Sequence, residues 1–271
     1  MNICSKRIIL KEKWPLLSAY LKEQGRGGLA VAYSGGVDSA LLAEAAWRVL
    51  GAKVMLVYFD MPLNAAADRR QAVALAQRQG WPCQVVEADP LQTPEVAANG
   101  RRRCYFCKSY LYRLLRREAE TLGLAALADG VNADDLTAYR PGNLAAEEAG
   151  ILHPLAEAGF HKADIRLLAR HWRLPNWDRP ASPCLASRFP YEQPLTLENL
   201  RLVEAGEKII AGYGFAPLRL RVHGDIARIE APRETLPRLI RQQEMIDALR
   251  QLGFRYITVD AQGLRSGSMD E

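Results

Sequence analysis

Short apolar runs of strand length alternate with longer amphipathic runs of helix length over the first half of the chain. The apolar runs lie at 29–33, 53–60, 84–87 and 124–129, and the amphipathic runs at 13–24, 38–50, 64–79 and 105–122. This alternation predicts a parallel sheet covered by helices on both faces, because each crossover between parallel strands needs a helix. We therefore expect a doubly wound α/β fold. Within it, Asn64 is predicted to be the N-cap of the helix that ends near Gln79.

The pattern changes near residue 175, where prolines at 175, 180, 183, 190 and 194 leave no room for a long element. Beyond them the pattern predicts a helix over 196–212, strands over 219–222 and 227–230, a helix over 235–252 and a last strand over 254–259. We predict a main domain over 1–192 and a small α+β domain over 193–271.

The most informative polar segment, Ser34-Gly35-Gly36-Val37-Asp38-Ser39, stands where the first strand turns into a helix. Free backbone N–H groups at a helix start favour an anion, and glycines let the backbone approach it. The serines add hydroxyl donors, and Asp38 fits beside a phosphate if Mg²⁺ lies between them. No lysine follows the glycines, so the segment is not the common P-loop.

Two other strand ends carry polar residues, at 60–62 and at 129–135. Ligands of open parallel sheets bind beyond the carboxyl ends of the strands, so these segments and residues 34–39 are expected to meet at one site. Asp129, Asn132 and Asp135 could serve adenosine or magnesium there, although helix capping explains them nearly as well.

Bulk properties narrow the class of protein. The 271 residues carry a net charge of only +5, and no apolar run reaches membrane-spanning length. The N-terminus lacks the pattern of a secretion signal, so a cytoplasmic protein without membrane association is expected. Basic residues concentrate between Arg101 and Arg117, which fits a solvated helix face, a phosphate-rich small molecule or RNA. No RNA-binding signature supports a nucleic-acid partner.

Three of the five cysteines need a chemical explanation. Cys104 and Cys107 form a C-x-x-C motif at a predicted helix start, and Cys184 lies in the proline-rich segment. Three thiolates with an open fourth position fit a [4Fe–4S] cluster. A redox pair, Cys104 with Cys107, beside a nucleophilic Cys184 is the second possibility. Three unrelated buried thiols are the third.

Several stretches together resemble one protein family. The segment S-G-G-V-D-S resembles the pyrophosphate loop (PP-loop) of the ATP pyrophosphatases. Nearly the whole chain resembles the LarE family, the ATP-dependent sulfur transferases of nickel-pincer cofactor synthesis. The matching stretches are R-C-Y-F-C-K at 103–108, D-G-V-N-A-D-D-L-T-A-Y-R-P-G at 129–142, P-L-A-E-A-G-F-H-K-A-D-I-R at 154–166, P-A-S-P-C-L-A-S-R-F-P-Y at 180–191, R-L-R-V-H-G-D-I-A-R-I-E at 219–230 and G-S-M-D-E at 267–271.

The resemblance implies a reaction. ATP would adenylate a carboxylate of pyridinium-3,5-dicarboxylate mononucleotide and release pyrophosphate, after which sulfur would displace AMP and leave a thiocarboxylate. It also implies that residues 1–192 form the PP-loop domain and that 193–271 serve substrate binding and oligomerisation. A homo-oligomer, and partnership with other enzymes of nickel-pincer synthesis, are further expectations.

The same resemblance assigns site residues. Ser34, Gly35, Gly36 and Ser39 would bind ATP and pyrophosphate, and Asp38 would hold Mg²⁺. Cys104, Cys107 and Cys184 would hold the [4Fe–4S] cluster that supplies sulfur. Substrate binding is assigned to Ser187, Arg188, Glu207, Arg219 and Arg221. The last two alternate on a predicted strand and so share one face. Lys108 is a further candidate for phosphate or carboxylate contacts, and Glu230 matches an acidic position near the substrate.

Three alternatives stay open from the sequence. Cys184 could instead give up its own sulfur, as in the sacrificial form of the family. A tRNA thiolase of the same superfamily could use three cysteines, but it would be expected to carry an extra RNA-binding region and a stronger basic stripe. A non-enzymatic nucleotide-binding module would bind ATP without releasing pyrophosphate, and would leave the three cysteines unexplained.

Overall fold

The computed structural model describes residues 9–137 and 141–265, which fall into two compact units. The first unit contains the residues before Pro94 and Cys104–Ser182; the second contains Pro94–Arg103 and the residues from Pro183 onward. The short excursion into the second unit is fixed there by backbone bonds, such as Leu195 N–H donating to the Ala97 carbonyl at 2.7 Å. The functional division at 192/193 stays a prediction.

A four-stranded parallel sheet forms the centre of the first unit, in the order β3-β2-β1-β4. Its strands are β1 (Leu29–Ala32), β2 (Val54–Asp60), β3 (Cys83–Glu87) and β4 (Ala126–Asp129). Ala32 pairs with Val57 on one side and with Asp129 on the other, so the strands end near one edge. The register thus brings the loops after β1, β2 and β4 to the same side of the sheet.

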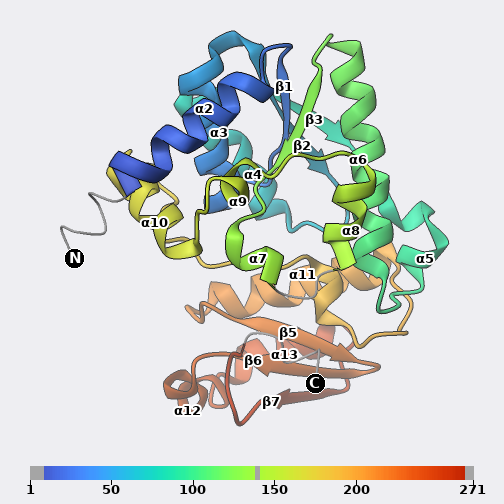
Figure 1. The fold of residues 1–271 in the computed structure, drawn as a ribbon. Helices are drawn as coiled ribbons and strands as arrows, with labels where there is room; N and C mark the ends of the chain where they lie inside the picture. Colours follow the sequence, from blue (N-terminus) through green and yellow to red (C-terminus); the bar gives the residue numbers. More distant parts are fainter. Residues whose placement is uncertain (1–8, 138–140, 266–271) are drawn as a thin grey trace. The chain divides into compact units, whose positions relative to one another are not determined.

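Helices cover both faces of this sheet, as the doubly wound pattern predicts (Figure 1). Helices α2 (Trp14–Gln24), α3 (Val37–Leu50), α4 (Ala66–Gln79) and α10 (Lys162–His171) share one core, and α6 (Arg103–Thr121) and α8 (Pro141–Glu148) share the other. Successive strand residues alternate between these cores. Val31 and Leu56 enter the first, and Ala30 and Val57 enter the second.

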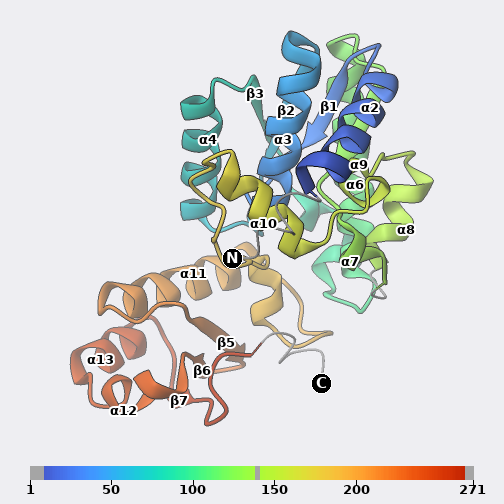
Figure 2. The same ribbon diagram turned by 60° about the vertical axis from the view of Figure 1, so that its left-hand side comes forward.

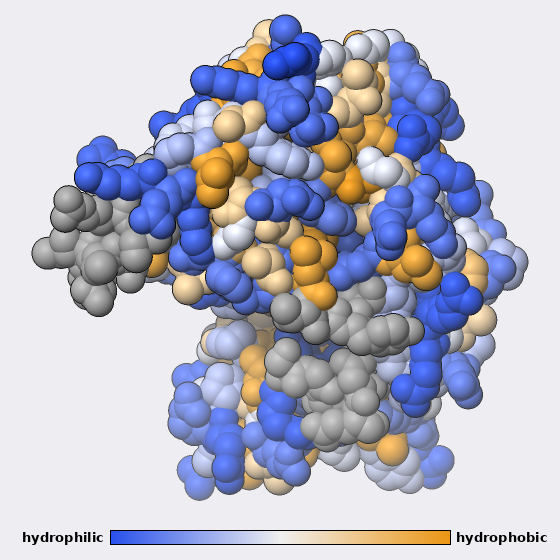
Figure 3. Space-filling view, in the orientation of Figure 1, coloured by the Kyte–Doolittle hydropathy of each residue, from blue (hydrophilic) through white to orange (hydrophobic). Residues whose placement is uncertain are grey.

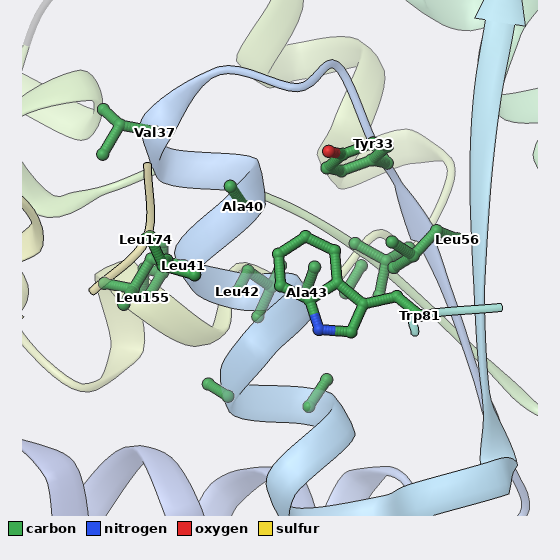
Figure 4. Packing of buried hydrophobic residues seen from close by; sticks show 14 of the residues in the cluster. Tyr33, Val37, Ala40, Leu41, Leu42, Ala43, Leu56, Trp81, Leu155 and Leu174 are labelled. Carbon is green, nitrogen blue, oxygen red and sulfur yellow. The ribbon is translucent and has the colours of Figure 1, made fainter. Parts of the chain in front are cut away.

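Helix α3 is buried along most of its length because it lies against the sheet and other helices pack on it. Small side chains such as Ala40 and Ala43 allow this close approach, which is visible in Figure 4. Trp81 packs edge-on against Tyr33, with ring centroids 6.1 Å apart. The Trp81 indole N–H donates to the buried Glu44 carboxylate at 3.0 Å. This packing fixes the helix whose first turn carries Asp38.

The connections contain further short elements that the sequence pattern did not predict. They are the π-helix η1 (Ile9–Lys13), the 3₁₀ turns η2 (Gly51–Lys53) and η3 (Pro90–Gln92), and the helices α5 (Pro94–Ala97), α7 (Ala133–Thr137) and α9 (Pro154–Glu157). The predicted cap of α4 is wrong, since its N-cap is Ala65. The Asn64 amide instead donates to the Phe59 carbonyl at 3.1 Å and holds the turn after β2.

The second unit is an α+β structure around a three-stranded sheet in the order β5-β6-β7 (Figure 2). Strands β5 (Arg219–His223) and β6 (Ile226–Glu230) are antiparallel, and β7 (Tyr256–Val259) runs parallel to β6. Helix α11 (Leu197–Gly212) contacts β5 and α13 (Gln243–Gln251). The proline-rich segment holds only the turn η4 (Leu185–Arg188) as an element of its own.

The single helix predicted over 235–252 is wrong. The structure has the turn η5 (Arg233–Thr235), the short helix α12 (Leu236–Leu239) and then α13. Gln242 before α13 has φ −83° and ψ 79°, which is not helical and separates the two helices.

The face seen in Figure 3 shows hydrophobic residues scattered among hydrophilic ones. Within residues 9–137 and 141–265, no helix combines the length and the apolar character needed to span a membrane.

Candidate functional site

Hydrogen bonds of its own serines fix the loop between β1 and α3. The Ser34 N–H donates to Ser39 Oγ at 3.2 Å, the two hydroxyl oxygens lie 3.1 Å apart, and Ser39 Oγ donates to the Gly36 carbonyl at 3.2 Å. Gly36 is the N-cap of α3 and offers no side-chain cap, so the first-turn N–H groups lack an intrahelical acceptor. Such N–H groups are compatible with an anion at this position, and binding of ATP or pyrophosphate here stays a prediction.

Gly35 is required by the path of this loop. Its φ of +75° lies in the left-handed region, and a Cβ there would stand 2.5 Å from the Ala72 Cβ and 2.8 Å from the Ala72 Cα. The loop is thus packed directly on α4. Asn176 supports it from the other side by donating from Nδ2 to the Gly35 carbonyl at 3.0 Å.

Asp38, in the first turn of α3, forms an ion pair with Lys162 through Oδ2. Lys162 begins α10, so this pair joins two helix starts. The other Asp38 oxygen, Oδ1, is buried and has no hydrogen-bond partner among the described residues. A buried carboxylate oxygen without a partner is costly unless a ligand satisfies it, and Mg²⁺ prefers such oxygens. The residue therefore fits the predicted magnesium role.

One cavity, about 630 Å³, touches this loop at Gly35 and is also lined by Asn176 and Arg179. Two others open on Ser34, Gly36 and Asp38 of the loop. The strand-end cavity, about 330 Å³, is lined from the three predicted strand ends, among others by Ser34, Met61 and Asp129, and from α6 by Lys108 and Tyr112. The loop cavity, about 220 Å³, is lined by Gly36, Asp38, Asp68, Lys162, Arg179 and Ser182, among others. Because Ser34, Gly36 and Asp38 line both, the cavities meet at the Ser34–Asp38 loop.

Asp129 is the centre of a buried network in the strand-end cavity. One oxygen accepts from the Val131 N–H at 3.0 Å and faces His153 Nδ1 at 2.7 Å. The other accepts from the Tyr112 hydroxyl at 2.7 Å and lies 3.5 Å from Lys108 Nζ. Burial raises the pKa of Asp129, but the hydrogen bond from His153 and the charge of Lys108 outweigh it and lower the pKa to about 2. The carboxylate thus stays ionised and orients Lys108 at the cavity wall.

Asn132 and Asp135 do act as caps, the alternative that the sequence left open. Asn132 Oδ1 accepts from the N–H groups of Asp134 and Asp135 at 2.9 and 3.3 Å, and Asp135 returns a bond by accepting from the Asn132 N–H at 3.2 Å. Asp135 also lines the strand-end cavity.

In the second unit, Arg188 organises the turn that carries Cys184. Its guanidinium makes a two-bonded pair with Glu207, at 2.8 and 3.1 Å, and donates from Nη1 to the Pro183 carbonyl at 2.9 Å and to Ser187 Oγ at 3.0 Å. Glu207 Oε1 also accepts from the Leu220 N–H at 3.0 Å. These bonds link η4, α11 and β5. Substrate contact by Ser187, Arg188 and Glu207 remains a prediction.

The two arginines predicted to share a strand face differ in environment. Arg221 is only 2% exposed, pairs with the fully buried Glu230 at 2.9 Å and donates to the Ser187 carbonyl at 2.5 Å. Arg219 is half-buried and donates to the Arg265 carbonyl at 3.1 Å. Burial and the neighbouring charges of Arg221 and Arg188 lower the pKa of Arg219. Both guanidiniums therefore have structural partners.

The described cysteines are Cys83, Cys104, Cys107 and Cys184, and no disulfide joins any two of them. Cys104 and Cys107 lie one turn apart on the first part of α6, so they face the same side of one helix. Cys184, before η4, belongs to the second unit. Across the part of the chain that the structure describes, no three His, Cys, Asp or Glu side chains are grouped as metal ligands. The C-x-x-C pair fits two ligand positions on one helix, and a cluster shared with Cys184 stays a prediction.

Sequence reasoning missed several residues of the loop cavity. Lys162 lies in the LarE-like stretch 154–166 but was given no role, and Asp68 and Arg179 were not singled out. They come from segments far apart in the chain, so only the fold brings them together. The predicted stretches at 138–140 and 267–271 lie outside the described residues.

Comparison with known proteins identifies relatives of this chain. The NAD synthase family matches residues 9–98, which hold the Ser34–Asp38 loop. The chain is 38% identical over 264 residues to the pyridinium-3,5-bisthiocarboxylic acid mononucleotide synthase of Lactiplantibacillus plantarum, covering 97% of this chain and 95% of that protein. It is 37% identical over 265 residues to an uncharacterized protein of Synechocystis, covering 97% and 98%.

A more distant relative is a glutamine-hydrolyzing GMP synthase of Aeropyrum pernix, 28% identical over 213 residues, with 72% of this chain and 41% of that protein covered. The α/β fold with its PP-loop and the sequence match over almost the full length indicate the same family. The chain therefore belongs to the LarE family, which includes the Lactiplantibacillus synthase.

Proposed function

We propose that this protein is an ATP-dependent sulfur transferase that converts a carboxylate of pyridinium-3,5-dicarboxylate mononucleotide into a thiocarboxylate. The observation that carries the proposal is the Asp38 site, where an unpartnered buried oxygen lies beside a lysine at the mouth of an anion-binding loop. The full-length similarity to the Lactiplantibacillus synthase supports this choice of substrate.

In the first step a substrate carboxylate oxygen attacks the α-phosphorus of ATP, and the bond to the β-phosphate oxygen breaks. The products are an acyl-adenylate and pyrophosphate. Negative charge gathers on the departing pyrophosphate, where the first-turn N–H groups of α3, Ser34, Ser39 and Lys162 can donate to it. Magnesium held by Asp38 would neutralise phosphate charge.

In the second step a sulfur nucleophile attacks the acyl carbon, and AMP leaves with the bonding electron pair. The substrate loses one oxygen to AMP and gains one sulfur. Lys108 stands at the wall of the strand-end cavity and can hold an anionic group there. Tyr58 and Met61 line the same cavity and can surround a purine ring.

We further propose that Cys104, Cys107 and Cys184 hold a [4Fe–4S] cluster. When bound, such a cluster would supply sulfide. The C-x-x-C spacing on one helix face supports the first two ligands. The alternative source is Cys184 itself, which would form a thioester and end as dehydroalanine. Either chemistry needs reduced thiols, and we propose that the protein works in the cytoplasm, where thiols remain reduced.

The test uses protein purified without oxygen. Iron and sulfide are measured, Mg²⁺, ATP and the dicarboxylate nucleotide are added, and the pyrophosphate, nucleotide and protein masses are followed. Pyrophosphate release with sulfur gained by the nucleotide supports the proposal. An intact Cys184 then indicates cluster-borne sulfur, whereas loss of hydrogen sulfide from Cys184 indicates sacrifice. ATP consumption without any mass change of the nucleotide would contradict it.

A further inference from the structure

The loop cavity contains two ion pairs, not one. Besides Asp38 with Lys162, Asp68 pairs with Arg179 at 2.5 Å, and both of these side chains are 23% exposed. All four charged residues line the cavity. Two cations and two carboxylates cancel each other, so the cavity as it stands has no excess of positive charge for the phosphates.

Asp68 binds Ser182 in addition to Arg179. Its Oδ1 accepts from Arg179 Nη2, and its Oδ2 accepts from the Ser182 hydroxyl at 2.8 Å. Asp68 stands in the first turn of α4, where a carboxylate is favoured by the helix dipole. Residues 179–182 line the cavity along their whole length. This Asp68 clasp, formed by Asp68, Arg179 and Ser182, therefore fixes a segment of the cavity wall.

A magnesium-bound triphosphate remains negatively charged, so binding it in this cavity requires cations that can leave their carboxylates. Asp38 can pass from Lys162 to magnesium. Arg179 uses Nη2 for Asp68, and its planar guanidinium carries further N–H donors suited to phosphate oxygens. Asp68 keeps the Ser182 hydroxyl and the start of α4 when Arg179 turns away.

We propose that Arg179 is a second binding residue for the departing pyrophosphate, stored on Asp68 and transferred to the phosphates when they arrive. This inference rests on the proposed function of the same site. It assigns to Asp68 the role of a competitor for Arg179. The two partners of one ion pair should then have opposite effects on phosphate affinity.

A merely structural clasp predicts something else. If the pair only held residues 179–182 in place, removing either partner would loosen the wall and weaken binding. Asp68→Asn separates these possibilities, because asparagine can still accept from Arg179 but no longer holds it by charge. The hydrogen bonds of the Asp68 clasp are kept, and less free energy is needed to separate the Arg179 side chain from residue 68.

The experiment measures binding of pyrophosphate and of ATP by calorimetry, with and without Mg²⁺. Arg179→Gln should weaken pyrophosphate binding about tenfold or more, the value of a charge-assisted hydrogen bond. Asp68→Asn should tighten it several-fold. Arg69→Gln is the matched control, since Arg69 neighbours Asp68, pairs with Asp60 at 2.6 Å and lines neither cavity.

The double variant Asp68→Asn with Arg179→Gln completes a double-mutant cycle, which tests whether the effect of Asp68→Asn depends on Arg179. If Asp68→Asn only removed a repulsive charge, its gain would persist without Arg179, and the proposal would be overturned. Weaker binding in Asp68→Asn alone would also overturn it, and a loss seen only with Mg²⁺ would make Asp68 a metal ligand instead. Failure of the wild type to bind ATP would refute the proposed function itself, a distinct result.

Discussion

Asp38 and Lys162 form an ion pair in the lining of the loop cavity, and Asp38 Oδ1 stays buried without a hydrogen-bond partner among the described residues. Asp38 lies in the first turn of α3 and Lys162 begins α10, so the positive ends of both helices meet at this ion pair. The site therefore concentrates donors around one acidic group, an arrangement suited to a metal-bound phosphate chain.

Asp38→Asn is expected to reduce pyrophosphate release on the order of 100-fold, because an amide cannot hold Mg²⁺ against the departing phosphates. Release is measured with a coupled pyrophosphate assay over a range of Mg²⁺ concentrations. Near-normal release at ordinary Mg²⁺ would remove Asp38 from the metal role. Asp164→Asn serves as the control, since Asp164 lies on α10 and pairs with Lys13 outside both cavities.

Lys162→Gln is expected to raise the KM for ATP and lower kcat, since it removes a donor to the phosphates and the cation that pairs with Asp38. We expect a loss of about 10- to 100-fold in kcat/KM. Steady-state kinetics with varied ATP measure it. The control is His161→Gln at the preceding position, whose ring faces the exposed Asp134 at 2.6 Å. Equal losses in both variants would point to damage at the start of α10.

Gly35→Ala is expected to destabilise the protein more than Gly123→Ala. Both glycines have positive φ, +75° and +67°, so both variants carry backbone strain of about 1 kcal/mol. A Cβ at Gly123 meets nothing within 4 Å, whereas one at Gly35 meets the Ala72 backbone at 2.8 Å. Urea unfolding should show an extra loss of about 1–3 kcal/mol for Gly35→Ala. Equal losses would mean that the loop moves away from α4 without cost.

Ionisation of Asp129 should make the free energy of unfolding depend on pH. Its folded pKa of about 2 lies below the ordinary aspartate pKa of 3.8, so the ionised form is favoured in the fold. The stabilisation, about 2 kcal/mol, is complete above pH 5 and is lost as pH falls from about 4 toward 2. Asp129→Asn should therefore be less stable than the wild type at pH 6, with a gap that narrows in acid. Thermal unfolding at several pH values measures the gap, and a constant gap would contradict the assignment.

The sequence was sufficient for the parallel sheet and the Ser34–Ser39 loop because both depend on local signals. Apolar runs such as Val54–Asp60 identify strands, and a double glycine before a helix identifies the turn between strand and helix. Helix α10 was missed, although its apolar positions repeat with helical spacing, and so was the Lys162 that begins it. The Asn64 prediction failed because the asparagine satisfies a carbonyl of β2, a tertiary contact that a local capping rule does not include.

The charged pairs of the site could not be predicted because each joins two residues that are far apart in the chain. Arg179 and Asp68 are separated by 111 residues, and Lys162 and Asp38 by 124. Each of these side chains taken singly is what a solvated surface carries. The arginines on β5 show the converse, since alternation correctly placed Arg221 on one face but did not reveal that Glu230 on the neighbouring strand would bury it.

Arg188 gives the last prediction, because it holds the turn that presents Cys184. Arg188→Lys keeps the charge but cannot reproduce the two-bonded pair with Glu207 together with the bond to the Pro183 carbonyl. Since Arg188 is only 5% exposed, we expect a loss of about 2–3 kcal/mol in the free energy of unfolding.

Local opening of the same turn should make Cys184 react faster with iodoacetamide in Arg188→Lys than in the wild type, as followed by mass spectrometry of the Cys184 peptide. Arg201→Lys is the matched control, because Arg201 is exposed on α11 near Glu207 in the chain and should change neither quantity. Unchanged Cys184 reactivity in a destabilised Arg188→Lys variant would show that η4 keeps its shape without the guanidinium. The pair with Glu207 would then stabilise the second unit as a whole, and the position of the thiol would depend on the backbone of the proline-rich segment.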